Sequence, residues 1–296
     1  MARIRADLML LFAAFIWGTA FVAQKTANET MGPVLFVGCR FLLSALLLAP
    51  MAWFERRRNP DPLPPGSWRL AGIIGVSLFG GLALQQIGMV TTTASNAGFI
   101  TAIYVVMVPV AAWALSRATP RLSVAAGCAL SLAGAWLLEG GVPLTQWNRG
   151  DLIILASDAL QAVQITLVER FLARASRPLL LSFAQYTVIG ILGLALGLAT
   201  EPFDIGGIRQ ALPAILYAGL LSGGVAFTLQ IVAQRHTPAA EAAIIMSLES
   251  VFAALAGAWL LGDRLGSTAL AGCATILLAV IVVQLAPLLR SKKAEA

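Results

Sequence analysis

The stretch LAGIIGVSLFGGLALQQIGMVTTTASNAGFITAIYVVMVPVAAWALS, residues 70–116, contains no charged residue. A helix needs about 20 mostly apolar residues to cross a bilayer, because each residue rises about 1.5 Å through a hydrocarbon core of about 30 Å. The stretch is therefore too long for one crossing and long enough for two. The three threonines at 91–93 provide a turn between the crossings. This stretch alone predicts an integral membrane protein.

The composition of the whole chain supports the same class. Of 296 residues, 59% are hydrophobic and 11% are charged, whereas soluble domains have about 45–50% apolar and about 25% charged residues. The charges needed to hydrate a globular surface are missing, so membrane lipid must cover much of it. The composition therefore excludes an ordinary soluble domain.

Ten segments are long and apolar enough to span the membrane. The uncharged run from Leu8 to Gln24 is longer than the apolar region of a usual signal peptide, so we interpret it as a retained first helix. The predicted spans are Asp7 to Lys25, Pro33 to Phe54, Trp68 to Val90, Ala94 to Leu115, Leu122 to Leu138, Gly150 to Phe171, Pro178 to Thr200, Gln210 to Ala233, Ala239 to Leu261 and Leu265 to Leu289.

The distribution of Lys and Arg predicts the orientation. With the N-terminus in the cytoplasm, fifteen of the twenty Lys and Arg residues fall on the cytoplasmic side, while Lys25, Arg149, Arg209 and Arg264 fall outside. This positive-inside bias predicts that both termini are cytoplasmic in a bacterial inner membrane. The net charge of +6 is then a result of topology, and a nucleic-acid partner need not be invoked.

The chain contains an internal repeat. A shift of 145 residues places Pro33 on Pro178, Gln85 on Gln230, and Gly127-Cys128-Ala129 on Gly272-Cys273-Ala274. We therefore predict two duplicated halves, residues 1–145 and 146–296. Each half crosses the bilayer five times, an odd number, so the second half enters from the opposite side. An inverted repeat of this kind is typical of secondary transporters.

A set of polar and aromatic residues falls near the predicted membrane midplane. Glu249 lies in the middle of the ninth span, and its counterpart under the shift is Tyr104; Asp158 and Gln161 share a face of the sixth span. Trp17 lies midway along the first span. Because intramembrane acids are costly, we predict that these five residues line a site for a zwitterion. Structural hydrogen bonds and core packing are the alternatives.

A second polar layer lies nearer the two membrane faces. Gln85 and Asn96 flank one turn, and their counterparts Gln230 and Glu241 flank the equivalent turn on the other side. An inverted twofold predicts an outer and an inner gate here, although ordinary capping of helix ends explains them equally well. Arg40 lies two turns into the second span. It either binds a carboxylate or, as we favour, extends outward and braces helix ends.

Signatures of soluble enzymes are missing from the sequence. The only histidine, His236, lies in a predicted turn, and no GxxxxGK[ST] loop for a nucleotide is present. The three cysteines lie in apolar runs without CxxC spacing, which favours packing over a metal site. We therefore expect no cofactor, no metal and no catalytic residue, and a transmembrane gradient as the energy source.

Two sets of motifs carry a family resemblance. The first half has Phe15-Ile16-Trp17-Gly18, Lys25, Pro33 and Arg40-Phe41; the second has Ser247-Leu248-Glu249-Ser250-Val251-Phe252-Ala253-Ala254 and Gly262-Asp263-Arg264-Leu265. Over nearly its whole length the chain resembles the EamA-type branch of the drug/metabolite transporter superfamily. It departs from that pattern at Ser250 and Asp263, where the family usually has Pro and Glu.

Within the family, the motif Ala97-Gly98-Phe99-Ile100-Thr101-Ala102-Ile103-Tyr104 is similar to that of YddG-type exporters of aromatic amino acids. This resemblance implies a ten-helix bundle around a cavity lined by helices 1, 3, 4, 6, 8 and 9, with helices 5 and 10 at the periphery, and alternating access. We expect an exporter of aromatic and other neutral amino acids.

Three other functions stay open from the sequence. They are export of another small metabolite or toxic organic cation by the same fold, an intramembrane enzyme, and a membrane scaffold or receptor. Glu249 or Asp158 could carry a coupling proton. The oligomeric state does not follow from the sequence.

Overall fold

The polypeptide folds entirely as helices in the part of the chain that the computed structural model describes, which is residues 2–92, 94–117, 119–138, 140, 148–256, 258–259 and 265–294. The helices are α1 (Ala2–Ala27), α2 (Pro33–Arg58), α3 (Ser67–Gly88), α4 (Ala94–Thr101), α5 (Tyr104–Ser116), α6 (Leu122–Leu138), α7 (Arg149–Arg174), α8 (Pro178–Thr200), α9 (Ile205–Leu216), the π-helix η2 (Tyr217–Ala226), α10 (Phe227–Ala233), α11 (Ala239–Met246), α12 (Leu248–Ala256) and α13 (Ser267–Ala294).

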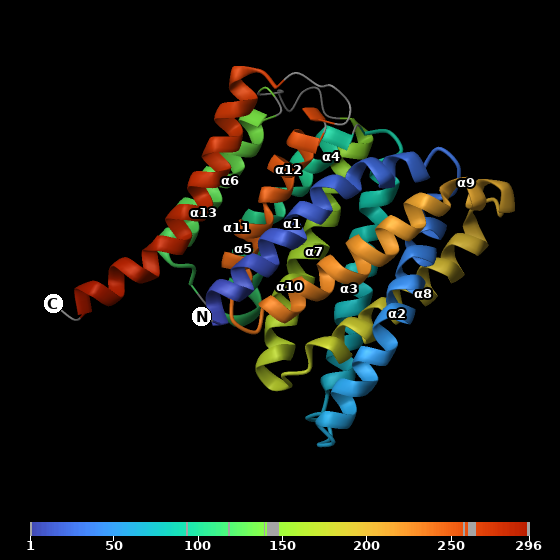
Figure 1. Ribbon diagram of the computed structural model, residues 1–296, viewed down its shortest axis with the longest axis horizontal. Coiled ribbons are helices and arrows are strands. Elements are labelled where there is room, and N and C mark those ends of the chain that lie inside the picture. Colours follow the sequence, from blue (N-terminus) through green and yellow to red (C-terminus); the bar gives the residue numbers. More distant parts are fainter. Residues whose placement is uncertain are drawn as a thin grey trace.

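Nine segments of the described residues are long and apolar enough to cross a membrane, and Leu122–Leu138 is a shorter apolar helix. These ten segments correspond to the ten predicted spans, which confirms the fold class. Leu261, residues 262–264 of the closing motif, and the predicted boundary at residues 145 and 146 lie outside the described residues. The start of α1 and the end of α13 lie toward the same end of the bundle (Figure 1).

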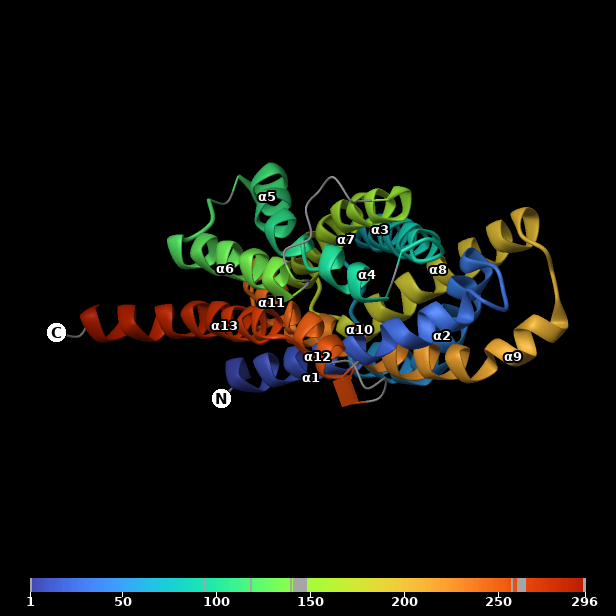
Figure 2. The ribbon, with the colours of Figure 1, turned by 90° about the horizontal axis from the view of Figure 1, so that it is seen from above.

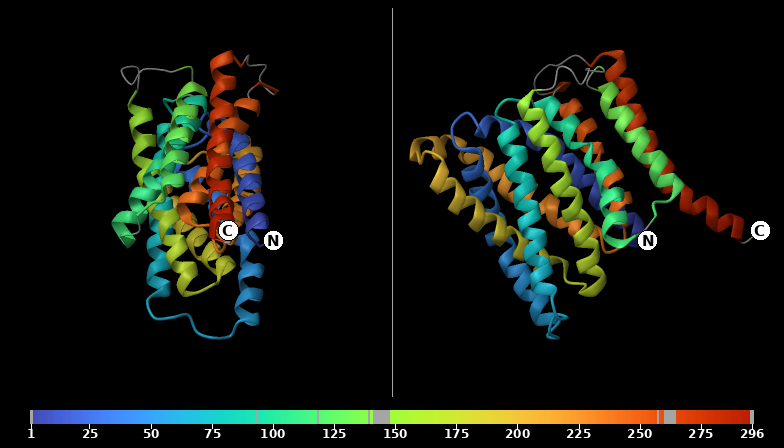
Figure 3. Two further views of the ribbon diagram at one scale, coloured as in Figure 1. Left: turned by 90° about the vertical axis from the view of Figure 1, so that its left-hand side faces the viewer. Right: turned by 180° about the vertical axis from the view of Figure 1, so that it is seen from behind.

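Equivalent helices of the two halves pack as pairs. The second span, α2, packs along its counterpart α8, and the fifth span, α6, packs along its counterpart α13. The α6 and α13 pair projects from one edge of the bundle (Figure 2), as expected for the peripheral helices. Within the rest of the bundle, α3 packs along α7, and α1 packs against η2, α10, α11 and α12. Seen from behind, the green α6 and the red α13 again lie side by side at one edge (Figure 3). This pairwise packing is what an approximate twofold axis between inverted repeats produces.

The α2 and α8 pair is joined by reciprocal helix caps. Glu201, after the end of α8, accepts hydrogen bonds from the backbone N–H groups of Val34 and Leu35 at 2.9 and 2.8 Å. Glu55, near the end of α2, accepts from Leu180 N–H at 2.8 Å at the start of α8. Each carboxylate satisfies donors that the first turn of a helix leaves free, and its charge favours the positive end of the helix dipole.

The fourth and ninth spans are broken at equivalent positions. The half-helices α4 (Ala94–Thr101) and α11 (Ala239–Met246) are related residue for residue by the 145-residue shift, and a new half-helix follows each of them. Tyr104 begins α5, and its counterpart Glu249 lies in the first turn of α12. Broken spans in corresponding positions are the feature that marks the substrate site of many inverted-repeat transporters.

Candidate functional site

A cavity lies between the two halves at the level of these helix breaks. Side chains from α1, α2, α3, α4, α5 and α7 line it, together with side chains from η2, α10, α11 and α12. Its volume is only about 40 Å³, which is room for a few water molecules. A larger solute therefore needs the helices to move apart. We call this space the central cavity.

Most of the predicted site residues meet in the central cavity. Of the predicted substrate-binding set, Trp17, Tyr104, Gln161 and Glu249 line it. Gln85, Gln230 and Arg40, predicted near the faces, line the cavity itself. The resemblance implied a cavity without the second helix, yet Arg40 brings α2 into the wall.

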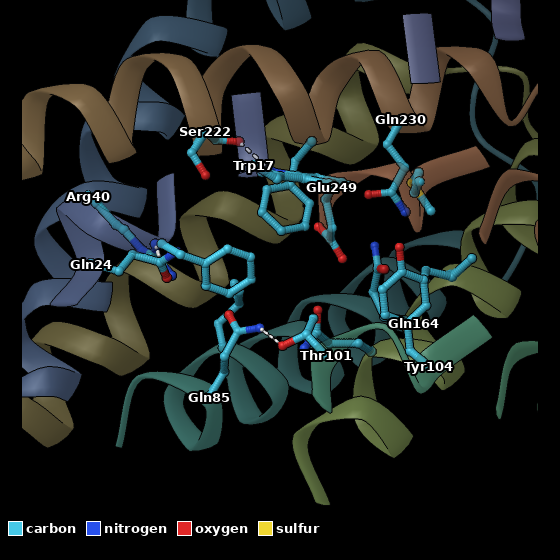
Figure 4. Close-up of a pocket in the computed structure, with 16 residues that line it drawn as sticks. Trp17, Gln24, Arg40, Gln85, Thr101, Tyr104, Gln164, Ser222, Gln230 and Glu249 are labelled. Carbon is cyan, nitrogen blue, oxygen red and sulfur yellow. Dashed lines mark hydrogen bonds between the residues drawn. The ribbon is translucent and has the colours of Figure 1, made fainter. Parts of the chain in front are cut away.

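Figure 4 shows how these side chains are distributed. Arg40 and Gln24 lie at one end of the cavity, whereas Gln164, Gln230 and Tyr104 lie at the other end. Glu249 and Trp17 lie between these two groups. The cavity therefore has a cationic end and an acidic region that are separated in space.

Aromatic rings form part of the cavity wall. The ring centroids of Trp17 and Phe227 are 4.6 Å apart with their planes tilted by 58°. The Trp17 indole N–H donates to the backbone carbonyl of Ser222 at 3.3 Å. Ser222 lies in the π-helix η2, and its carbonyl also accepts from the backbone N–H of Phe227. This contact fixes the indole against η2 and leaves a broad apolar surface beside the polar groups.

Several cavity amides are held by other side chains. Gln85 Nε2 donates to Thr101 Oγ1 at 3.0 Å, which joins α3 to the break in the fourth span. Gln164 Nε2 donates to Gln185 Oε1 at 3.3 Å. Each amide keeps further donors or acceptors for a ligand.

Three oxygen atoms at the acidic region have no hydrogen-bond partner. They are Glu249 Oε1, Gln230 Oε1 and the hydroxyl oxygen of Tyr104, and all are buried. The Tyr104 hydroxyl lies close enough to the Glu249 carboxyl group to interact with it. Buried polar groups are nearly always paired in folded proteins, so unpaired ones require an explanation. Acceptors that converge on a cavity are suited to a ligand that donates hydrogen bonds.

Asp158 lies beside the central cavity but does not line it. Its side chain is fully buried in α7, and neither carboxyl oxygen has a hydrogen-bond partner. The carboxyl groups of Asp158 and Glu249 are within electrostatic range of each other, and so is the Tyr104 hydroxyl. Asp158 therefore belongs to the electrostatic surroundings of the site.

Glu241 and Asn96, predicted as gate residues, lie away from the central cavity. Glu241 forms ion pairs with Arg3 and Arg121, the second at 3.6 Å. Asn96 is half-buried in α4. The Glu241 ion pairs close the end of the bundle where α1 begins; we call this region, with Asp7 and Thr237, the N-terminal-end cluster.

A matching cluster closes the opposite end. Thr92 Oγ1 donates to Asp151 Oδ1 at 2.8 Å, just as its counterpart Thr237 donates to Asp7 at 3.1 Å at the N-terminal end. Lys25 Nζ donates to the carbonyls of Met89 and Thr92 at 2.7 and 2.8 Å. We call Lys25, Thr92 and Asp151 the opposite-end cluster. None of the residues of the two clusters lines the central cavity.

Sequence reasoning missed nine residues that complete the cavity wall. Their apolar, hydroxyl or amide side chains resemble many others in the ten spans, so composition does not distinguish them. Gln24 was detectable, because its amide lies in an apolar helix directly before Lys25. The nine are Phe21, Gln24, Leu82, Thr101, Gln164, Ile165, Ser222, Phe227 and Met246.

Known proteins provide a further test of this architecture. The model of the EamA-like transporter family matches twice, at residues 4–139 and 148–285. The chain is 32% identical over 284 residues to an uncharacterized transporter of Archaeoglobus fulgidus, covering 96% of this chain and 87% of that protein. It is 26% identical over 298 residues to the uncharacterized transporter YwfM of Bacillus subtilis, covering 98% and 97%.

A more distant relative and a solved structure are also similar to this chain. A transporter of S-adenosylmethionine and S-adenosylhomocysteine from Chlamydia trachomatis is 24% identical over 209 residues, covering 67% of this chain and 63% of that protein. A solved crystal structure has the same fold, with a TM-score of 0.77 at 17% identity over 96% of this chain and 98% of the other. From the two family matches and the relative of 32% identity, the chain belongs to the EamA-like transporter family.

Proposed function

We propose that this protein is a secondary transporter that exports amino acids, aromatic ones and other neutral ones, by alternating access. The observation that carries this proposal is the convergence of unpaired acceptors and aromatic rings on one cavity between two inverted halves. Glu249 and Tyr104 supply the acceptors, and Trp17 and Phe227 supply the rings.

The chemistry of the cavity suits an amino acid. A substrate ammonium group can donate to Glu249 and Tyr104, and it meets the electron-rich face of an indole favourably. An aromatic or aliphatic side chain can pack on Trp17 and Phe227. The amides of Gln161 and Gln230 add polar contacts at the rim of that surface.

Two similarities support an amino-acid cargo. S-adenosylmethionine and S-adenosylhomocysteine, the cargo in the name of the chlamydial relative, both carry an α-amino and an α-carboxylate group. The motif at residues 97–104 resembles that of YddG-type exporters of aromatic amino acids. Both similarities point to the amino-acid head group as the part that is recognised.

Alternating access would work through the two end clusters. Opening of the N-terminal-end cluster, with Glu241 released from Arg3, would admit substrate from one side while the opposite-end cluster stays closed. The reverse arrangement would release it. The rigid units would be the two halves, residues 1–145 and 146–296. Asp158 and Glu249 are the candidates for carrying a proton with the substrate.

The distribution of Lys and Arg supports an orientation of the protein in the membrane. Fifteen of the twenty Lys and Arg residues lie on the side of the N-terminus, so the positive-inside rule places both termini in the cytoplasm of a bacterial inner membrane. The N-terminal-end cluster then faces the cytoplasm, and substrate leaves through the opposite end.

Export of a toxic organic cation is the alternative for the same fold. Arg40 lines the cavity with a guanidinium group that no carboxylate neutralises among the described residues. A buried positive charge repels a cation, so this cavity favours a cargo that carries a negative group.

The test is uptake of a panel of labelled amino acids into proteoliposomes, with and without a pH gradient. We expect saturable uptake of aromatic amino acids, and a fall of about 10- to 100-fold in apparent affinity for Glu249→Gln, because a charge-assisted hydrogen bond is lost. Transport of another metabolite, with no movement of any amino acid, would refute the proposal.

A further inference from the structure

Arg40 is a buried cation with unused hydrogen-bond donors. Its side chain is 2% exposed and lines the central cavity. Nη1 donates to Gln24 Oε1 at 2.9 Å, but Nε and Nη2 have no partner. Nε and Nη2 lie on the same edge of a guanidinium group. The unoccupied donors therefore form one fork, the arrangement that binds a carboxylate through two parallel hydrogen bonds.

Neighbouring side chains hold the guanidinium group in place but do not accept hydrogen bonds from Nε or Nη2. The guanidinium carbon lies 5.2 Å from the ring centroid of Phe36 and 5.3 Å from that of Phe41. The backbone carbonyl of Gln24 accepts from Gln86 Nε2 at 2.9 Å, which fixes the residue that holds Arg40. A residue that only braced helices would use all its donors, and an arginine that reached outward would be exposed. Arg40 does neither.

The positions of Arg40 and Glu249 indicate how a zwitterionic substrate would be oriented in the cavity. In Figure 4 Arg40 lies at one end of the central cavity, and Glu249 lies further along it. The cavity therefore has a guanidinium group at α2 and a carboxyl group further along it. A zwitterion bound between these two groups, which we call the poles of the cavity, would point its carboxylate at Arg40 and its ammonium at Glu249.

We propose that Arg40 binds the carboxylate of the transported substrate and that the cavity selects for this group. The proposal deepens the proposed function, on which its amino-acid part rests, by assigning each end of the head group to one pole. It replaces the structural role that the sequence favoured for Arg40. It also predicts that amines which lack a carboxylate are poor ligands.

Three ligands separate the contributions of the two poles. L-phenylalanine has both charged groups, phenethylamine lacks the carboxylate, and 3-phenylpropionate lacks the ammonium. Binding of each would be measured on the purified full-length protein in nanodiscs by isothermal titration. The variants are Arg40→Gln, which removes the charge, and Arg40→Lys, which keeps the charge without the fork. Cys39→Ala is the control, because it changes the neighbouring residue of α2, which does not line the cavity.

We expect Arg40→Gln to weaken binding of both carboxylates by about 10- to 100-fold, as for loss of a charge-assisted pair. Binding of phenethylamine should stay within about twofold or improve. Arg40→Lys should weaken binding of the two carboxylates to an intermediate degree, and Cys39→Ala should change it little. Thermal unfolding of each variant shows that it is folded, and Arg40→Lys supplies the result if Arg40→Gln is not.

Distinct outcomes overturn the two proposals. Equal weakening of all three ligands by Arg40→Gln, or the same effect from Cys39→Ala, would show that α2 acts only structurally and would overturn the inference. So would equal affinity of the wild type for L-phenylalanine and phenethylamine, although amino-acid transport could then still hold. Binding of 3-phenylpropionate without L-phenylalanine would refute the proposed function and keep the role of Arg40. Failure of both carboxylates to bind would overturn the inference.

Discussion

The carboxyl group of Asp158 shows what a single residue can reveal. It is fully buried in α7, and neither of its oxygen atoms has a hydrogen-bond partner. The carboxyl group of Glu241, in contrast, forms ion pairs with Arg3 and Arg121. An unpaired charge inside a membrane protein is costly, whereas removal of one member of a buried ion pair is itself destabilising. Replacement of each acid by its amide is therefore expected to affect the free energy of unfolding differently at Asp158 and at Glu241.

We predict that Asp158→Asn changes the free energy of unfolding little, since the amide has nearly the same shape and the carboxyl oxygens make no hydrogen bond. Glu241→Gln should lower it by about 1 kcal/mol or more, because Arg3 and Arg121 lose their acceptor. Thermal unfolding in detergent at matched pH measures both. A loss of about 3–5 kcal/mol for Asp158→Asn would show that this carboxylate has an essential partner.

At the scale of the element, Gly18 sets the distance between α1 and α12. A Cβ atom added there would lie 2.6 Å from the carbonyl oxygen of Glu249 and 2.8 Å from the backbone nitrogen of Ala253. These are backbone atoms, so neither can turn aside. The glycine of the Phe15-Ile16-Trp17-Gly18 motif thus allows α12 to bring Glu249 to the cavity.

We predict that Gly18→Ala costs about 1–3 kcal/mol of stability by overpacking and also lowers transport, because α12 must shift with Glu249. Gly72→Ala in α3 is the matched control, since nothing lies within 4 Å of its added Cβ. That change should be neutral or stabilise by up to about 1 kcal/mol. Unfolding and uptake measurements on both variants test this, and a neutral Gly18→Ala would contradict the close contact.

At the scale of the whole molecule, the ten spans place the α2–α3 connection and the α8–α9 connection at opposite ends of the bundle. Asn59 follows α2, and Phe203 lies exposed between α8 and α9. We predict that a membrane-impermeant maleimide labels Phe203→Cys but not Asn59→Cys in intact cells, and that inside-out vesicles reverse this. The native cysteines, Cys39, Cys128 and Cys273, are removed first as background. Labelling of both sites from one side would refute the inverted arrangement.

The sequence by itself determined the membrane class, the ten crossings and the inverted duplication. The bilayer makes this possible, because every span needs about 20 apolar residues, and an odd number of spans per half must invert the copy. Because the spans are apolar on all sides, the sequence does not indicate which face of each helix points into the bundle. Gln85 and Gln230 were thus assigned to gates nearer the membrane faces, whereas both lie in the wall of the central cavity.

Only the tertiary structure decided which side chains share a site. The break in the ninth span falls at Ser247, and neither α11 nor α12 contains a proline that would have predicted it. The ion pair between Arg3 and Glu241 joins residues 238 positions apart. Arg40 has a buried, half-used guanidinium because α1 and α2 enclose it, and no pattern along one helix encodes contacts with another.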